Sequence, residues 1–153
     1  MRVYKTNQIR NIALLGHLGS GKTTIAESLL FVSGGIAQKG TIETKSTVSD
    51  YMDEEKMKQG SLSTSLIPVE WADMKLNFLD VPGTEELDNE IKQALNVVKG
   101  AILVVDATKG VEIGTARLWQ HLTAAHIPTV LFVNKMEKKT LSLIMLLMIL
   151  ETN

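Results

Sequence analysis

The stretch Gly16-His17-Leu18-Gly19-Ser20-Gly21-Lys22-Thr23 decides the fold of this chain of 153 residues. It fits the phosphate-loop pattern G-x-x-x-x-G-K-[ST], in which successive backbone N–H groups at the start of a helix form a nest for phosphate oxygens. Gly21 lets the backbone approach the phosphates, Lys22 places a charge on the β- and γ-phosphates, and Thr23 offers a hydroxyl to Mg²⁺. The stretch therefore predicts a nucleotide-binding loop between a strand and a helix.

A phosphate loop requires a strand before it and a helix after it, and the flanking residues predict both. Residues 9–15, which end in the apolar run 12–15, are predicted to form the first strand, and residues 23–33 have apolar side chains at helical spacing before two glycines. Residues 39–60 are polar and weakly periodic, so we expect a long functional or mobile loop there. The phosphate loop therefore has the expected strand before it and the expected helix after it.

Further along, short apolar runs alternate with helical patterns, which predicts an α/β fold with a mainly parallel sheet and helices on both faces. Strands are expected at 62–71, 74–79, 101–105 and 129–133, and helices at 85–99 and 114–126. The runs 101–105 and 129–133 are typical of strands buried on both faces. Residues 62–71 and 74–79 predict an antiparallel pair, and Pro68 places the earlier strand at the sheet edge because it has no N–H to donate.

Composition limits the classes of function. Lys and Arg number 16 against 17 Asp and Glu, so a net charge of −1 gives no electrostatic reason for direct binding to nucleic acid or membranes. The absence of cysteine excludes disulfides and cysteine-based metal sites, and it fits the reducing cytoplasm. The longest apolar run, 141–150, is half the length of a membrane span. We therefore expect a soluble cytoplasmic domain without a targeting segment.

Asp80-Val81-Pro82-Gly83 follows the strand predicted at 74–79. A carboxylate at the carboxyl end of a parallel strand faces the ligand crevice of such sheets, where Asp80 can hold Mg²⁺ through a water. The backbone N–H of Gly83 can reach a γ-phosphate. Alone the stretch fits an ordinary turn, but after a phosphate loop it predicts a second part of the nucleotide site.

Asn134-Lys135-Met136-Glu137 follows the strand predicted at 129–133. Guanine presents two adjacent donors, N1–H and the 2-amino group, and a carboxylate such as that of Glu137 can accept from both. Adenine offers no such pair. The stretch predicts recognition of guanine, and a plain polar turn is the alternative.

These three motifs, in this order and spacing, resemble the GTPase domain of translational GTPases, in particular elongation factor G, its paralogues and the tetracycline-resistance ribosomal protection proteins. Shorter stretches at 10–12, 27–30, 47–50, 107–110 and 114–115 are similar to that group, and the resemblance covers about residues 8–137. It implies a P-loop fold with Mg²⁺-dependent GTP hydrolysis linked to the ribosome.

The resemblance also implies roles for individual residues. GTP or GDP would contact Gly16, His17, Leu18, Gly19, Ser20, Gly21, Lys22, Thr23, Thr24, Asp80, Gly83, Asn134, Lys135 and Glu137. Thr23 and Asp80 would hold the metal ion. Lys22, Gly83 and Thr84 would take part in hydrolysis.

Four residues depart from the family pattern. Thr84 replaces a histidine associated with the attacking water, and Leu62 stands where a threonine usually reaches Mg²⁺. Glu137 replaces an aspartate on guanine, and Gly19 replaces an acidic residue of the phosphate loop. These departures leave two hypotheses, a ribosome-linked GTPase or a GTP/GDP-binding module with little or no hydrolysis. An ATPase is a third, disfavoured by Asn134 and Lys135.

The chain divides into two parts in this interpretation. Residues 1–137 are expected to form a GTPase domain that lacks the family's final guanine-binding element. Residues 138–153 form an atypical apolar tail, for which a helix packed on the sheet, a truncated or frame-shifted product and an interaction helix remain open.

Overall fold

The computed structural model describes residues 3–42, 44, 46–48, 63–83 and 88–138. In chain order the elements are a short 3-10 turn (Thr6–Gln8), β1 (Ile9–Gly16), α1 (Lys22–Val32), β2 (Ser65–Trp71), β3 (Met74–Asp80), α3 (Asp88–Val97), β4 (Gly100–Asp106), α4 (Ile113–Ala124) and β5 (Thr129–Asn134). Each predicted strand and helix is present, with ends that differ by a few residues. Residues 62 and 85–87 of the predicted elements, and the tail from 139, lie outside the described ranges.

In the described part of the chain, the sheet has five strands in the order β2-β3-β1-β4-β5. β3, β1, β4 and β5 run parallel, and β2 pairs antiparallel with β3. Pro68 therefore lies on an edge strand, as predicted. Ala72 and Asp73, both at positive φ, form the tight turn between β2 and β3. Because the four parallel strands end at one side of the sheet, the motifs that follow them converge there.

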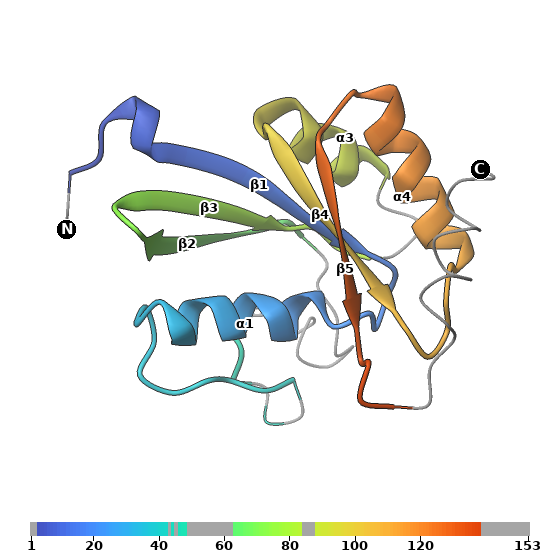
Figure 1. Cartoon of the computed structure of the whole chain (residues 1–153), viewed down its shortest axis with the longest axis horizontal. Coiled ribbons are helices and arrows are strands. Elements are labelled where there is room, and N and C mark those ends of the chain that lie inside the picture. Colours follow the sequence, from blue (N-terminus) through green and yellow to red (C-terminus); the bar gives the residue numbers. More distant parts are fainter. Residues whose placement is uncertain (1–2, 43, 45, 49–62, 84–87, 139–153) are drawn as a thin grey trace.

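Helices cover both faces of the sheet, as expected (Figure 1). On one face α1 packs over a buried cluster that includes Leu14 and Val104. On the other face α3 and α4 pack over a cluster that includes Leu15 and Leu103. Successive strand residues thus point into opposite cores, which explains why residues 12–15 of β1 and 101–105 of β4 are continuously apolar.

The prediction that residues 129–133 are buried on both faces is wrong. Among the described strands, β5 is the second edge of the sheet, and Val130 and Phe132 are 63% and 44% exposed. They pair with Ile102 and Val104, so they lie on the face that α1 covers. α1 packs against β1, β2 and β3, at the other end of the sheet, which leaves this side of β5 open in the described part of the chain.

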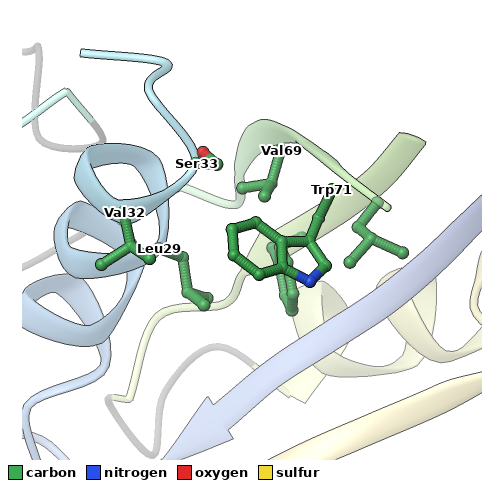
Figure 2. A pocket seen from close by; sticks show the side chains of 7 residues that line it. Leu29, Val32, Ser33, Val69 and Trp71 are labelled. Carbon is green, nitrogen blue, oxygen red and sulfur yellow. The ribbon is translucent and has the colours of Figure 1, made fainter. Parts of the chain in front are cut away.

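An apolar pocket of about 210 Å³ lies between the carboxyl end of α1 and the β2–β3 pair (Figure 2). Its lining residues are Leu29, Val32, Ser33, Val69, Trp71, Leu76 and Phe78. Trp71 lies beside Val69 and remains 57% exposed, so it only partly packs against its neighbours. The pocket is at the end of α1 away from the phosphate loop, and it is therefore separate from the candidate site.

Val69→Ala is expected to lower the free energy of unfolding by about 2 kcal/mol, because two buried methyl groups are removed beside an existing pocket. Val69 is 3% exposed. Urea unfolding followed by circular dichroism measures the change. Val130→Ala is the matched control, expected to cost less than about 0.5 kcal/mol because its side chain faces solvent. Equal losses in the two variants would contradict the assignment of β5 as an exposed edge.

Candidate nucleotide-binding site

The phosphate loop connects the end of β1 to the start of α1, as predicted. Gly19 and Gly21 have φ values of 78° and 97°, which other residues rarely adopt. A Cβ atom at Gly21 would collide with the side-chain amide of Asn134. Glycine at position 21 is therefore required both by the backbone conformation and by the close approach of Asn134 at the end of β5.

Lys22 and Ser20 provide polar groups inside this loop. Lys22 is 7% exposed, and its Nζ donates to the carbonyl oxygen of Gly16 at 2.9 Å. Ser20 is 1% exposed, and its Oγ makes no hydrogen bond among the residues that the structure describes. A buried hydroxyl without a partner is costly unless a ligand satisfies it. This loop therefore fits a group with several acceptor oxygens, such as a phosphate.

Asp80 and Gly83 lie against the phosphate loop. The Oγ1 of Thr23 donates to Oδ2 of the fully buried Asp80 at 3.1 Å. A Cβ atom at Gly83 would lie 2.6 Å from Lys22 Nζ and 2.7 Å from the Gly16 carbonyl oxygen. Only glycine fits there. The two motifs thus contact each other and bring together a hydroxyl, a carboxylate and an ammonium group.

The third motif, which begins with Asn134 and Lys135, also contacts the phosphate loop. The side-chain amide of Asn134 donates to the Ser20 carbonyl oxygen at 2.9 Å. Lys135 Nζ donates to the carbonyl oxygen of Gly19 at 2.7 Å and to Oδ2 of Asp106 at 2.6 Å. Lys135 has a φ of 62°, a left-handed conformation that turns the chain over the loop. Residues at opposite ends of the domain's sequence are therefore in direct contact.

Asp106 is a residue that the sequence interpretation missed. It ends β4 as Asp80 ends β3, and that position is the signal that could have found it. Burial alone would raise the pKa of Asp106, but hydrogen bonds from Lys135 and Thr108 outweigh burial and lower this pKa to about 2. Asp106 is therefore ionised at neutral pH and holds the Lys135 ammonium group over the phosphate loop.

The other predicted residues lie around this centre. Glu137 is exposed in the turn after β5, and Leu18 is 48% exposed. The ring of His17 lies 3.4 Å from Glu112. Thr24 lines a pocket of about 300 Å³ with Lys39, Gly40, Thr41, Ile42 and Thr47. Thr84 and Leu62 lie outside the described residues.

A preformed all-protein metal cage is not found in the described ranges. No group of three or more His, Cys, Asp or Glu side chains is arranged to hold a metal ion there. Thr23 and Asp80 supply two oxygen ligands side by side. That donor set fits Mg²⁺, which typically takes one or two protein oxygens together with nucleotide phosphates and waters.

A family model, the elongation factor Tu GTP binding domain, matches residues 7–149. The resemblance to translational GTPases seen in the motifs is thereby confirmed. The match extends through all three parts of the site and through the sheet that brings them together.

Individual relatives agree with the family match. The chain is 36% identical over 137 residues to mitochondrial ribosome-releasing factor 2 of Danio rerio, and 35% identical over 136 residues to the tetracycline resistance protein TetO of Streptococcus mutans. These alignments cover 90% and 89% of this chain but 18% and 21% of the relatives. The chain therefore spans about a fifth of the length of these relatives.

A solved structure has the same fold. A crystal structure from Thermus thermophilus superposes with a TM-score of 0.88 at 34% sequence identity, over 95% of this chain and 22% of that one. The predicted P-loop architecture is thereby confirmed. Among the described residues, no helical stretch reaches the length and hydropathy of a membrane span.

Proposed function

Since this chain belongs to the family of elongation factor Tu GTP-binding domains, we propose that it binds GTP and GDP with Mg²⁺ where β1, β3, β4 and β5 end. One observation carries the proposal: Asn134 and Lys135 are hydrogen-bonded to the phosphate loop itself. The guanine base would be recognised by the residues at and after the end of β5, and the phosphates of the same nucleotide would be held by the loop before α1. The distance between base and phosphates would be set by direct contacts and not by a mobile linker.

Each part of the site has a proposed role. The N–H groups of residues 16–24 and the Lys22 ammonium group would hold the α-, β- and γ-phosphates. Glu137 would accept from the two guanine donors, and its exposure leaves the longer side chain free to retract. Asn134 and Lys135 would lie beside the base and position it relative to the phosphate loop. The complete proposed set is Gly16, His17, Leu18, Gly19, Ser20, Gly21, Lys22, Thr23, Thr24, Asp80, Gly83, Asn134, Lys135 and Glu137.

Thr23 and Asp80 would hold Mg²⁺ in this proposal. When bound, the ion would neutralise charge on the β- and γ-phosphates. The 3.1 Å contact between Thr23 Oγ1 and Asp80 Oδ2 supports the pairing, because both oxygens then face one position. Thr23 would bind directly and Asp80 through a water.

Hydrolysis would proceed by in-line attack of a water on the γ-phosphate. Lys22 would stabilise the charge that develops on the β,γ-bridging oxygen, and the N–H of Gly83 would contact the γ-phosphate. Thr84 would help to place the water. The ribosome is the proposed partner, mostly through parts that this chain does not contain, since a relative at 36% identity is named a ribosome-releasing factor. The proposed compartment is the cytoplasm.

Thr84→His is expected to raise the rate of GTP hydrolysis by at least about tenfold, because an imidazole can orient or deprotonate water more effectively than a threonine hydroxyl. Phosphate release from saturating GTP, with and without purified ribosomes, measures the rate. GDP affinity serves as the internal control and is expected to stay within about threefold. A variant that binds GTP but hydrolyses it no faster would contradict the role given to Thr84.

A second candidate function is a GTP/GDP-binding module with little turnover. Thr84 and Leu62 favour it, because they replace a histidine associated with the attacking water and a threonine that usually reaches Mg²⁺. The same assay separates the two functions. A GTPase releases more phosphate when ribosomes are added, whereas a binding module releases it at the same low rate in both conditions.

A further inference from the structure

Glu27 is a buried carboxylate that the proposed reaction does not use. It lies in the middle of α1 and is 1% exposed. Burying an ionised side chain is costly unless its oxygens receive hydrogen bonds. Its partners in the described part of the chain are two backbone N–H groups. Gly40 donates to Oε2 at 2.9 Å, and Val48 donates to Oε1.

These two donors are the ends of a short stretch of which the structure describes residues 40–42, 44 and 46–48; we call these described residues the 40–48 segment. Inside it, Ser46 donates from its backbone N–H to the Thr41 carbonyl oxygen at 3.2 Å, and Thr41 donates from its N–H to Ser46 Oγ at 3.1 Å. The Thr44 hydroxyl lies 2.8 Å from the hydroxyls of both Thr41 and Ser46. The Glu27 carboxylate therefore accepts hydrogen bonds from the N–H groups at both ends of this segment, and further hydrogen bonds connect residues within the segment.

The contact leaves no room for a side chain at Gly40. A Cβ atom there would collide with the Ser46 carbonyl oxygen and lie 3.0 Å from Glu27 Oε2. The close approach of backbone to carboxylate thus depends on glycine at position 40. This offers a way to disturb the contact without changing Glu27.

The segment is also adjacent to the nucleotide-binding helix. Gly40, Thr41 and Thr47 line a pocket of about 300 Å³ together with Thr24 in the first turn of α1. Glu27 lies one helical turn after Thr23 and shares its buried helix face. The same helix therefore carries the phosphate-binding groups and the carboxylate that holds the 40–48 segment.

We propose that Glu27 is a positioning residue that ties the 40–48 segment to α1, so that this segment forms a wall beside the bound nucleotide and slows its release. The inference rests on the proposed nucleotide binding. Glu27 contacts no reacting atom in this proposal. It acts through the two backbone N–H groups, and its effect is on the dissociation rate of the nucleotide.

Glu27→Gln tests the proposal, because an amide keeps the volume but turns one acceptor into a donor that faces a backbone N–H. Hydrogen exchange of the 153-residue chain is expected to become at least about tenfold faster at Gly40 and Val48, and the release of a fluorescent GDP at least about fivefold faster. Exchange inside α1, at Ile25 for example, is expected to stay unchanged. Gly40→Ala, with Glu27 intact, is expected to give the same pattern.

Glu70→Gln is the matched control, since Glu70 is exposed on β2 and is expected to change neither quantity. Unchanged exchange at Gly40 and Val48 in both test variants would contradict the claim that Glu27 holds the 40–48 segment to α1. Faster exchange with an unchanged GDP release rate would overturn the link to the nucleotide. If the wild-type chain binds no GDP, the proposed function fails. The exchange data still test whether Glu27 holds the 40–48 segment to α1.

Discussion

Lys22→Ala is expected to lower the affinity of the chain for GDP and GTP by at least about 100-fold. Hydrogen bonds to charged groups are typically worth about 1.5–3 kcal/mol each, and the ammonium group would contact two phosphates at once. Every 1.4 kcal/mol corresponds to a factor of about ten in affinity. Fluorescence titration with a labelled GDP measures the loss.

Two further variants make this result specific. Lys92→Ala removes a lysine from the exposed side of α3 and is expected to leave the affinity unchanged. Lys22→Met keeps most of the buried stem and removes the charge, so it is expected to lose affinity as Lys22→Ala does while unfolding in urea nearly as the wild type. Tight GDP binding by Lys22→Met would mean that the phosphates bind elsewhere.

Asp106→Asn is expected to lower the free energy of unfolding at pH 7 by about 2 kcal/mol and to weaken GDP binding at least about tenfold. The substitution keeps the shape but removes the charge that holds Lys135, and hydrogen bonds to charged groups contribute about this much. Without Asp106, the ammonium group of Lys135, whose side chain is 27% exposed, is free to turn towards water. Urea unfolding and GDP titration measure the two effects.

The stability effect is expected to depend on pH. The pKa of Asp106 is about 2 in the folded chain against an ordinary value of 3.8, so the folded state favours the ionised form. Its contribution is complete well above pH 3.8 and is lost as the pH falls through 2. About half of the difference between Asp106→Asn and wild type should therefore remain at about pH 3. A difference that does not change between neutral pH and this acidic pH would contradict the ion pair.

A double substitution shows whether Asp106 acts through Lys135. If it does, Asp106→Asn combined with Lys135→Met should cost little more than Lys135→Met alone, because the partner has already been removed. Additive losses would assign Asp106 a separate role, for example through its hydrogen bonds to Thr108. Glu70→Gln again serves as the surface control.

The strands, helices and phosphate loop could be predicted because their signals are local. Apolar runs and helical periodicity give the elements, and the glycines of the loop mark conformations that other residues avoid. Pro68 even identified one edge of the sheet. The other edge could not be predicted, because the run 129–133 is as apolar as a buried strand and its exposure depends on how far α1 extends across the sheet.

The contacts that complete the site depend on residues far apart in sequence. Asp106 was missed because its partner, Lys135, lies 29 positions away and is brought to it only by the pairing of β4 with β5. The role of Glu27 could not be predicted, because nothing near it in sequence indicates the backbone N–H groups of Gly40 and Val48. Motif spacing identifies which groups meet a ligand. It does not identify the buried groups that hold those residues in position.

Recognition of a guanine nucleotide is tested most directly by titrating the purified 153-residue chain with labelled GDP and labelled ADP under the same Mg²⁺ concentration. We expect GDP to bind with a dissociation constant in the micromolar range or below, and ADP to bind at least about tenfold more weakly because adenine lacks the paired donors for Glu137. Equal affinities would contradict guanine recognition by the loop after β5. The absence of binding by either nucleotide would contradict nucleotide binding altogether.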